Sequence, residues 1–137
     1  MPDTISKVDY YSMGLPNQPG EGAFRLSILG EAGVSLVALW GYPVAQGQSN
    51  IDLVPADAAG FKRAVKKAGL QISEKKSAFL VQGKDRPGAV ASWLAILGAA
   101  GINVRAAQAV CAGSGRYGAV IAVEQGDVRK AAKVLGV

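Results

Sequence analysis

The stretch Pro87-Gly88-Ala89-Val90-Ala91-Ser92-Trp93-Leu94-Ala95-Ile96-Leu97-Gly98-Ala99-Ala100-Gly101-Ile102-Asn103-Val104 predicts a loop, a helix, a tight turn and the start of a strand. A similar stretch, residues 19–34, lies 68 positions earlier in the chain. When the two stretches are aligned without a gap, they have identical residues at nine positions, which in the first stretch are Pro19, Gly20, Ala23, Leu26, Ile28, Leu29, Gly30, Ala32 and Gly33. This self-similarity indicates an internal duplication.

The order of predicted elements also repeats. In the first repeat we expect strand 10–15, a helix to about Ala32 ended by Gly33, strands 34–40 and 51–54, a helix capped by Asp57, and a short strand 70–73. In the second repeat we expect strand 77–82, helix 88–100, strands 102–111 and 117–124, and a helix capped by Asp127. The plan is β-α-β-β-α-β, which predicts an α+β fold of two ferredoxin-like repeats, each with an antiparallel sheet and both helices on one face. We place the repeats at 1–74 and 75–137.

The second repeat lacks a counterpart of strand 70–73 before Val137. An open apolar edge of a sheet favours aggregation, so another segment should fill it. Residues 4–7 precede the first predicted strand as residues 72–75 precede that of the second repeat. We therefore hypothesise that residues 3–8 supply the missing edge strand, from the same chain or from a partner chain.

The strand at 34–40 is apolar on both faces. Alternation directs Val34, Leu36, Ala38 and Trp40 to one side, and Val37 and Leu39 to the other. A sheet covered by helices on one face usually shows polar residues on the opposite face. We therefore expect both faces to be buried, by packing between the repeats and by formation of a homo-oligomer, most simply a dimer.

Composition places the chain among cytoplasmic proteins. It has 137 residues with a net charge of +5, and it contains a single cysteine, Cys111, which fits a reducing compartment. No run reaches the ~18 apolar residues of a membrane span, and the first residues have no signal-peptide pattern. The moderate positive charge is typical of a solvated basic face.

The sequence argues against catalysis. It contains no histidine, which removes imidazole bases and histidine metal sites. Cys111 lies in a predicted strand and is expected to be a small buried hydrophobic residue. The acidic residues are scattered, and the glycine pairs at 20–22 and 113–115 lack the third glycine of a dinucleotide loop. We expect no enzyme activity, no metal and no cofactor.

The residues Asp85-Arg86-Pro87-Gly88, a helix and then Ala100-Gly101-Ile102-Asn103-Val104, on this element plan, resemble the ACT domain. ACT domains are small regulatory modules that typically bind amino acids. The resemblance covers about residues 8–137 and makes the chain similar to a stand-alone pair of ACT domains. It is looser in the first repeat, where Asn17 replaces Asp85 and Ser35 replaces Asn103.

The resemblance implies an amino-acid site between the loop after the first strand and the neighbouring domain's second strand. A helix N-terminus there favours a carboxylate, and Gly88 allows close approach to the backbone. Asp85 and Asn103 supply acceptors for an α-ammonium group. The candidate ligand-binding residues are Asp85, Arg86, Pro87, Gly88, Ala89 and Asn103, with Asn17, Gly20 and Ser35 as a weaker second set.

Other interpretations remain open. The glycines are explained equally well as punctuation of helices, although this explains Asn103 poorly because asparagine is unfavourable in strands. The chain is also compatible with a protein-interaction scaffold that regulates a separate metabolic enzyme. RNA-recognition motifs share the element plan, but the stacking positions in residues 116–123 are aliphatic and the basic residues cluster on the second helices.

Overall fold

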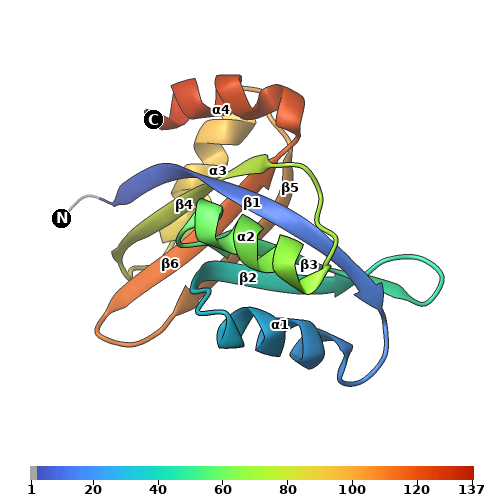
Figure 1. The fold of residues 1–137 in the computed structure, drawn as a ribbon. Coiled ribbons are helices and arrows are strands. Elements are labelled where there is room, and N and C mark those ends of the chain that lie inside the picture. The colour runs from blue at the N-terminus through green and yellow to red at the C-terminus, as the bar shows by residue number, and fades with distance from the viewer. Residues whose placement is uncertain (1–2) are drawn as a thin grey trace. The chain divides into compact units, whose positions relative to one another are not determined.

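The computed structural model describes residues 3–137 and is drawn in Figure 1. Within that range the elements are β1 (Thr4–Pro16), α1 (Glu21–Glu31), β2 (Leu36–Pro43), β3 (Gln48–Pro55), α2 (Ala58–Ala68), β4 (Lys76–Lys84), α3 (Ala89–Ala99), β5 (Val104–Cys111), β6 (Arg116–Val123), a 3-10 turn (Gln125–Asp127) and α4 (Val128–Leu135). The fold is therefore α+β and of the ferredoxin-like type, as the sequence predicts.

The chain divides into two compact units. The first unit is Asp9–Lys76, and the second unit combines Ser77–Val137 with the described residues up to Val8. Strand β1 is one continuous strand of 13 residues (Figure 1), and it gives its first part to the second unit and the remainder to the first unit. Each unit has its own hydrophobic core.

In the first unit the strand order is β2-β3-β1. Both strand pairs are antiparallel, with Leu53 of β3 opposite Tyr11 of β1 and opposite Leu39 of β2. Alternate residues of β1 and β3 pack against Leu29 of α1 and Phe61 of α2, so both helices cover the same face. Leu53 and Phe61 are fully buried, which makes this helix-covered face the core of the unit.

The expectation for the faces of β2 is wrong in two respects. The pairing shifts between Leu36 and Ala38, so Val37 is the extra residue of a β-bulge and Leu36 shares a face with Leu39 instead of Trp40. Val37 and Leu39 are also half exposed rather than buried, at 47% and 46%. The reason is that β2 is an edge strand, with β3 as its neighbour on one side only.

Residues 70–73 do not form the predicted strand. Ser73 donates its N–H to the carbonyl of Ser12 at 2.8 Å, and its Oγ accepts the N–H of Ser12 at 2.9 Å. A side-chain oxygen thus replaces the backbone carbonyl that a continuing ladder would use, which ends the pairing after one residue.

The second unit has the strand order β1-β4-β6-β5, in which β1 contributes Thr4–Val8 at the edge beside β4. Phe79 of β4 lies opposite Ile121 of β6, and Ile121 lies opposite Ala107 of β5. Phe79, Ile121, Leu97 of α3 and Ala131 of α4 are fully buried in one cluster. A pairing shift between Val104 and Ala106 gives β5 the same type of bulge as β2.

The helix ends follow the sequence prediction with one exception. Gly33 and Gly101, which follow α1 and α3, have φ of 80° and 74°, in the left-handed region. Asp57 and Asp127 occupy the N-cap positions of α2 and α4, but neither makes a side-chain capping hydrogen bond. The predicted N-cap positions are therefore confirmed, but the predicted capping hydrogen bonds are not formed.

Gly98 and Gly101 lie three positions apart, and replacing each by alanine should change the stability of the fold in opposite directions. Gly101→Ala places a Cβ in the left-handed region and should lower the free energy of unfolding by about 1–2 kcal/mol. Gly98→Ala, inside α3 with no atom within 4 Å of the new Cβ, should raise it by up to about 1 kcal/mol. Urea denaturation of both variants measures the two changes, and a loss of stability in Gly98→Ala would contradict this account.

Candidate functional site

The loop between β4 and α3 is held in place by backbone hydrogen bonds. Asp85 donates its N–H to the carbonyl of Gly115 at 2.8 Å, and Ala89 donates to the carbonyl of Arg86 at 3.3 Å. Gly88 precedes the helix with φ of 77°, a conformation that glycine adopts without strain. The loop therefore leads into α3 with the first-turn N–H groups of the helix directed at the loop side.

A pocket of about 360 Å³ opens beside this loop. Its lining comprises Asp85, Arg86, Gly88, Ala89, Val90, Ala91, Ala109, Val110, Cys111 and Tyr117. The pocket thus joins the N-terminus of α3 to the last residues of β5, all within the second unit. Its chemistry combines a carboxylate, a guanidinium and helix N–H groups with apolar walls, which suits a small zwitterion.

Cys111 is exposed, contrary to the expectation of a buried hydrophobic residue. It is the last residue of β5, which is an edge strand, and its thiol faces the carboxylate of Asp85. The hydrogen bond to Asp85 raises the pKa of the Cys111 thiol, with a smaller contribution from burial. A raised pKa favours the protonated thiol, which is the less nucleophilic form of cysteine.

Four of the six candidate residues of the second repeat meet at this pocket, namely Asp85, Arg86, Gly88 and Ala89. Pro87 is exposed and is not part of the lining. Asn103 is exposed and follows the C-terminal end of α3, whereas the pocket lies at the N-terminal end. An 11-residue helix is about 16 Å long, so Asn103 does not reach the pocket of its own unit.

The first unit repeats the backbone of the loop with different side chains. Asn17 donates its N–H to the carbonyl of Gly47 at 2.8 Å, as Asp85 does to Gly115, and Gly20 has φ of 87°. Ser35 lies elsewhere, in the segment between α1 and β2. The second set of candidate residues is thus divided between the two ends of α1.

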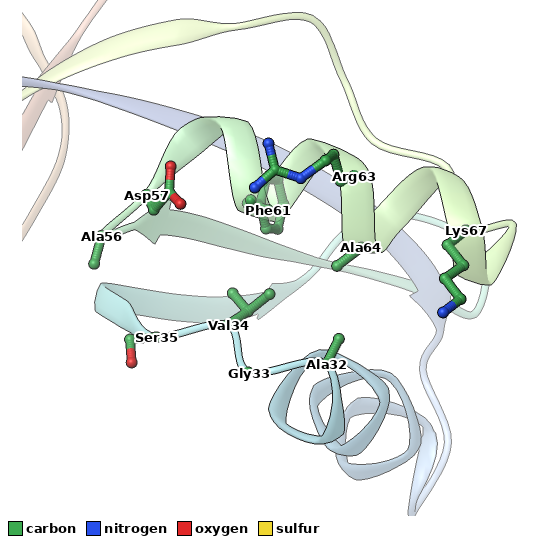
Figure 2. A pocket seen from close by; sticks show the side chains of 11 residues that line it. Ala32, Gly33, Val34, Ser35, Ala56, Asp57, Phe61, Arg63, Ala64 and Lys67 are labelled. Carbon is green, nitrogen blue, oxygen red and sulfur yellow. The ribbon is translucent and has the colours of Figure 1, made fainter.

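Ser35 lines a larger cavity, of about 540 Å³, in the first unit. Figure 2 shows it on the segment after Gly33, with Asp57, Arg63 and Lys67 contributed from the side of α2. Ser35 also accepts the N–H of Ala56 through its backbone carbonyl at 2.9 Å. Sequence reasoning missed this cavity, although the basic face of α2 was visible in the sequence.

A cluster of polar side chains around Asp3 adjoins the pocket of the second unit. The guanidinium of Arg86 donates to both oxygens of the Asp3 carboxylate, at 3.0 and 3.1 Å. Trp93 donates through Nε1 at 2.8 Å and Tyr117 through its hydroxyl at 2.7 Å, both to Oδ2. The Asp3 side chain is only 3% exposed, whereas that of Arg86 is 45% exposed.

These contacts set the ionisation of the cluster. The hydrogen bonds from Arg86 above all, and then those from Tyr117 and Trp93, hold the pKa of Asp3 far below its usual range, against the opposing effect of burial. Burial raises the pKa of Tyr117, and its hydrogen bond to Asp3 adds to this effect. Asp3 is therefore a carboxylate and Tyr117 a neutral donor at neutral pH.

Sequence reasoning did not identify Asp3, Trp93 or Tyr117 as members of a site. Asp3 was visible only as the start of the proposed edge strand, and Trp93 only as part of the predicted helix 88–100. Their convergence depends on residues up to 114 positions apart, for which local sequence patterns carry no signal.

No helix among residues 3–137 is long and apolar enough to cross a membrane. In the same range, no three acidic or cysteine side chains gather closely enough to hold a metal ion.

Substitution of Asp3 should give a pH-dependent loss of stability. Because the folded-state pKa is depressed, the carboxylate stabilises the fold fully above the ordinary aspartate pKa of about 3.9, and this contribution is lost as pH falls below it. Asp3→Asn should therefore be less stable than the original chain at pH 7, by about 2 kcal/mol. The difference should shrink below about pH 4. Denaturation of both proteins across this range measures it, and a difference independent of pH would contradict the assignment.

Comparison with protein-family models finds no match, and neither does comparison with curated proteins by sequence. Solved structures do match. A protein from Bacteroides thetaiotaomicron is 19% identical, with a TM-score of 0.81 over 96% of this chain and 88% of the other. The ligand-free regulatory subunit of aspartate kinase from Thermus thermophilus is 15% identical, with a TM-score of 0.65 over 98% of this chain and 94% of that subunit.

The regulatory subunit of aspartate kinase from Thermus flavus is similarly related, with 16% identity, a TM-score of 0.62 and coverage of 98% and 94%. Identities this low support the fold rather than a shared ligand. The resemblance to the ACT domain is confirmed at this level: the chain has the fold of the ACT-type regulatory domains of aspartate kinase.

Proposed function

We propose that the chain is a non-catalytic regulatory protein that senses a free amino acid at the pocket between Asp85 and the N-terminus of α3. The observation that supports this most directly is the composition of the pocket, which combines an anionic acceptor with helix N–H groups within about 360 Å³. An amino acid carries an ammonium group and a carboxylate a short distance apart. The pocket offers a partner for each.

In the proposed complex the α-ammonium group donates to the carboxylate of Asp85, which already accepts the thiol of Cys111. The α-carboxylate accepts from the first-turn N–H groups of Val90 and Ala91, where the helix dipole favours an anion. The left-handed Gly88 leaves space on this side, since it has no side chain and no atom lies within 4 Å of where a Cβ would be. Ala109 and Val110 provide apolar contact for the amino-acid side chain.

A neighbouring copy completes the pocket in this proposal. Val110 of edge strand β5 is 67% exposed, and it also lines the pocket. Asn103 lies too far away to act in its own unit, so a second copy that places its equivalent segment over the loop would bring the asparagine to the ligand. We therefore propose a homodimer through edge strands, which would also satisfy their unpaired backbone groups.

The regulatory output follows from such a dimer. A ligand held between two copies binds the associated state better than the separated state, and this difference in affinity is what shifts a conformational equilibrium. We propose that the partner that reads the shift is a separate metabolic enzyme, because the similar Thermus chains are regulatory subunits of aspartate kinase. A protein-interaction scaffold without a ligand remains the alternative, and the first experiment distinguishes the two.

A thermal-shift screen against the twenty amino acids tests the ligand. A selective ligand at about 100 times its Kd should add about 2.7 kcal/mol to the free energy of unfolding and raise the midpoint. Asp85→Ala should abolish the shift. The matched change in the first unit, Asn17→Ala, should leave it in place, because Asn17 has no charge with which to pair an ammonium group. No shift with any amino acid would reject the sensor and favour the scaffold.

Light scattering tests the dimer. Val110→Lys places a charge on the proposed interface and should convert the dimer to a monomer. Val134→Lys, at a 37% exposed valine on α4, is the control and should leave the dimer intact. A monomeric original chain, or a dimer unaffected by Val110→Lys, would contradict the proposed interface.

A further inference from the structure

The donors around Asp3 have the composition of a binding site for a small carboxylate. A bidentate guanidinium fixes the plane of a carboxylate, and the indole of Trp93 and the hydroxyl of Tyr117 add two further donors. All three donors come from the second unit itself, from the loop, α3 and β6. The acceptor is the carboxylate of Asp3, which is distant in sequence from all three donors.

The floor of the site is shaped for this group. Gly83 of β4 lies opposite Tyr117 of β6, on the helix-covered face. A Cβ at Gly83 would lie 2.8 Å from Cγ of Asp3 and would collide with its Oδ1. The absence of a side chain at position 83 therefore makes the space in which the carboxylate sits, and any side chain larger than hydrogen would fill it.

The equivalent positions of the first unit are not built this way. Leu15 lies opposite Ser49 in the pairing that corresponds to Gly83 and Tyr117. The positions 68 residues before Arg86 and Trp93 are Gln18 and Arg25. Arg25 pairs with Glu21 of its own helix at 2.8 Å. The carboxylate site is thus a property of the second unit and not a requirement of the shared fold.

We propose that Gly83, Arg86, Trp93 and Tyr117 form a binding site for small free carboxylates, and that Asp3 is a tethered occupant of this site which a free carboxylate replaces. Replacement removes the anchor that precedes Thr4–Val8, the edge strand beside β4, and so loosens that strand. This site is separate from the amino-acid pocket proposed above, although Arg86 and Tyr117 border both.

The geometry identifies the best probe. Truncation of Asp3 to alanine removes one carbon and two oxygens, which are the three heavy atoms of formate. Formate should therefore fit the vacated space, whereas acetate carries an additional methyl group directed at the rest of residue 3. In the original chain a tethered carboxylate competes at an effective concentration of the order of millimolar or more, so free formate should bind there more weakly than in the variant.

The test measures the melting midpoint of purified Asp3→Ala in sodium formate and in sodium chloride at equal ionic strength. Formate should raise the midpoint of Asp3→Ala well above the chloride value, acetate should do so less, and the original chain should show a much smaller difference. Addition of Arg86→Gln to the variant should abolish the response, because the bidentate donor is gone. Equal responses of Asp3→Ala to formate and chloride would overturn the proposal.

A second measurement uses the original chain and does not depend on the folding of a variant. Hydrogen exchange of the amides of Thr4–Val8 should accelerate in concentrated formate relative to chloride, while the amides of β6 should not change. Exchange of Thr4–Val8 that is identical in the two salts would contradict replacement of Asp3. If Asp3→Ala is unfolded in chloride, recovery of the fold in formate supports the site, and failure to recover rejects it.

Discussion

Backbone pairing along the outer edge of β4 is the constraint on which the second unit depends. β4 pairs with β6 on one side, and its other side needs a partner for its N–H and C=O groups. Thr4–Val8 of β1 provide that partner, and Thr4 adds a side-chain bond to the carbonyl of Gln82 at 3.4 Å. Asp3 lies one residue before this strand. The same pairing that closes the edge therefore brings a carboxylate to Arg86, Trp93 and Tyr117.

The burial of this carboxylate is favourable only because hydrogen-bond donors satisfy both of its oxygens. An ionised group removed from water loses its hydration, and this cost is offset where charged and neutral donors replace the water on both oxygens. Asp3 receives four such bonds. Arg86 keeps nearly half of its side chain in solvent, so the pair carries the desolvation of one ion rather than of two. Edge pairing and ion burial thus support each other at the same few residues.

Much of the fold could be predicted because its signals are local or repeated. Gly33 and Gly101, which follow α1 and α3, are local signals of a helix end. The nine shared identities show that the same signal occurs in both halves of the chain. The faces of β2 could not be predicted, because a bulge at Val37 changes the alternation by one residue without any mark in the sequence. Cys111 was placed inside because the strand looked buried, whereas the register puts it at the end of an edge strand.

The candidate site shows the same division. Asp85, Arg86, Gly88 and Ala89 are neighbours in sequence, and a loop followed by a helix necessarily keeps them together. Asn103 was included through a resemblance, and the 11 residues of α3 separate it from the loop within one unit. Asp3 and Tyr117 meet only because the strand order places β1 and β6 on either side of β4. Such a contact follows from topology and not from any pattern along the chain.

The two units show how one backbone accommodates different chemistry. Their loops share the bond from residue 17 or 85 to a glycine carbonyl, and both edge strands carry a bulge at the same place. The side chains differ where the second unit holds its carboxylate, since Leu15 is buried in the core of the first unit at the position of Gly83. The lack of a side chain at Gly83 thus leaves space for the carboxylate of Asp3, whereas Leu15 fills the equivalent space in the first unit.

Linkage gives this asymmetry a functional consequence. A free carboxylate that replaces Asp3 must favour the state in which Thr4–Val8 are loosened, and by reciprocity anything that holds Thr4–Val8 in place must weaken binding of that carboxylate. Arg86 and Tyr117 also line the pocket at Asp85, so an amino acid bound there, as we propose, would change the surroundings of the same two donors. Under these two proposals, Thr4–Val8 would be the element through which binding at the loop alters the sheet of the second unit.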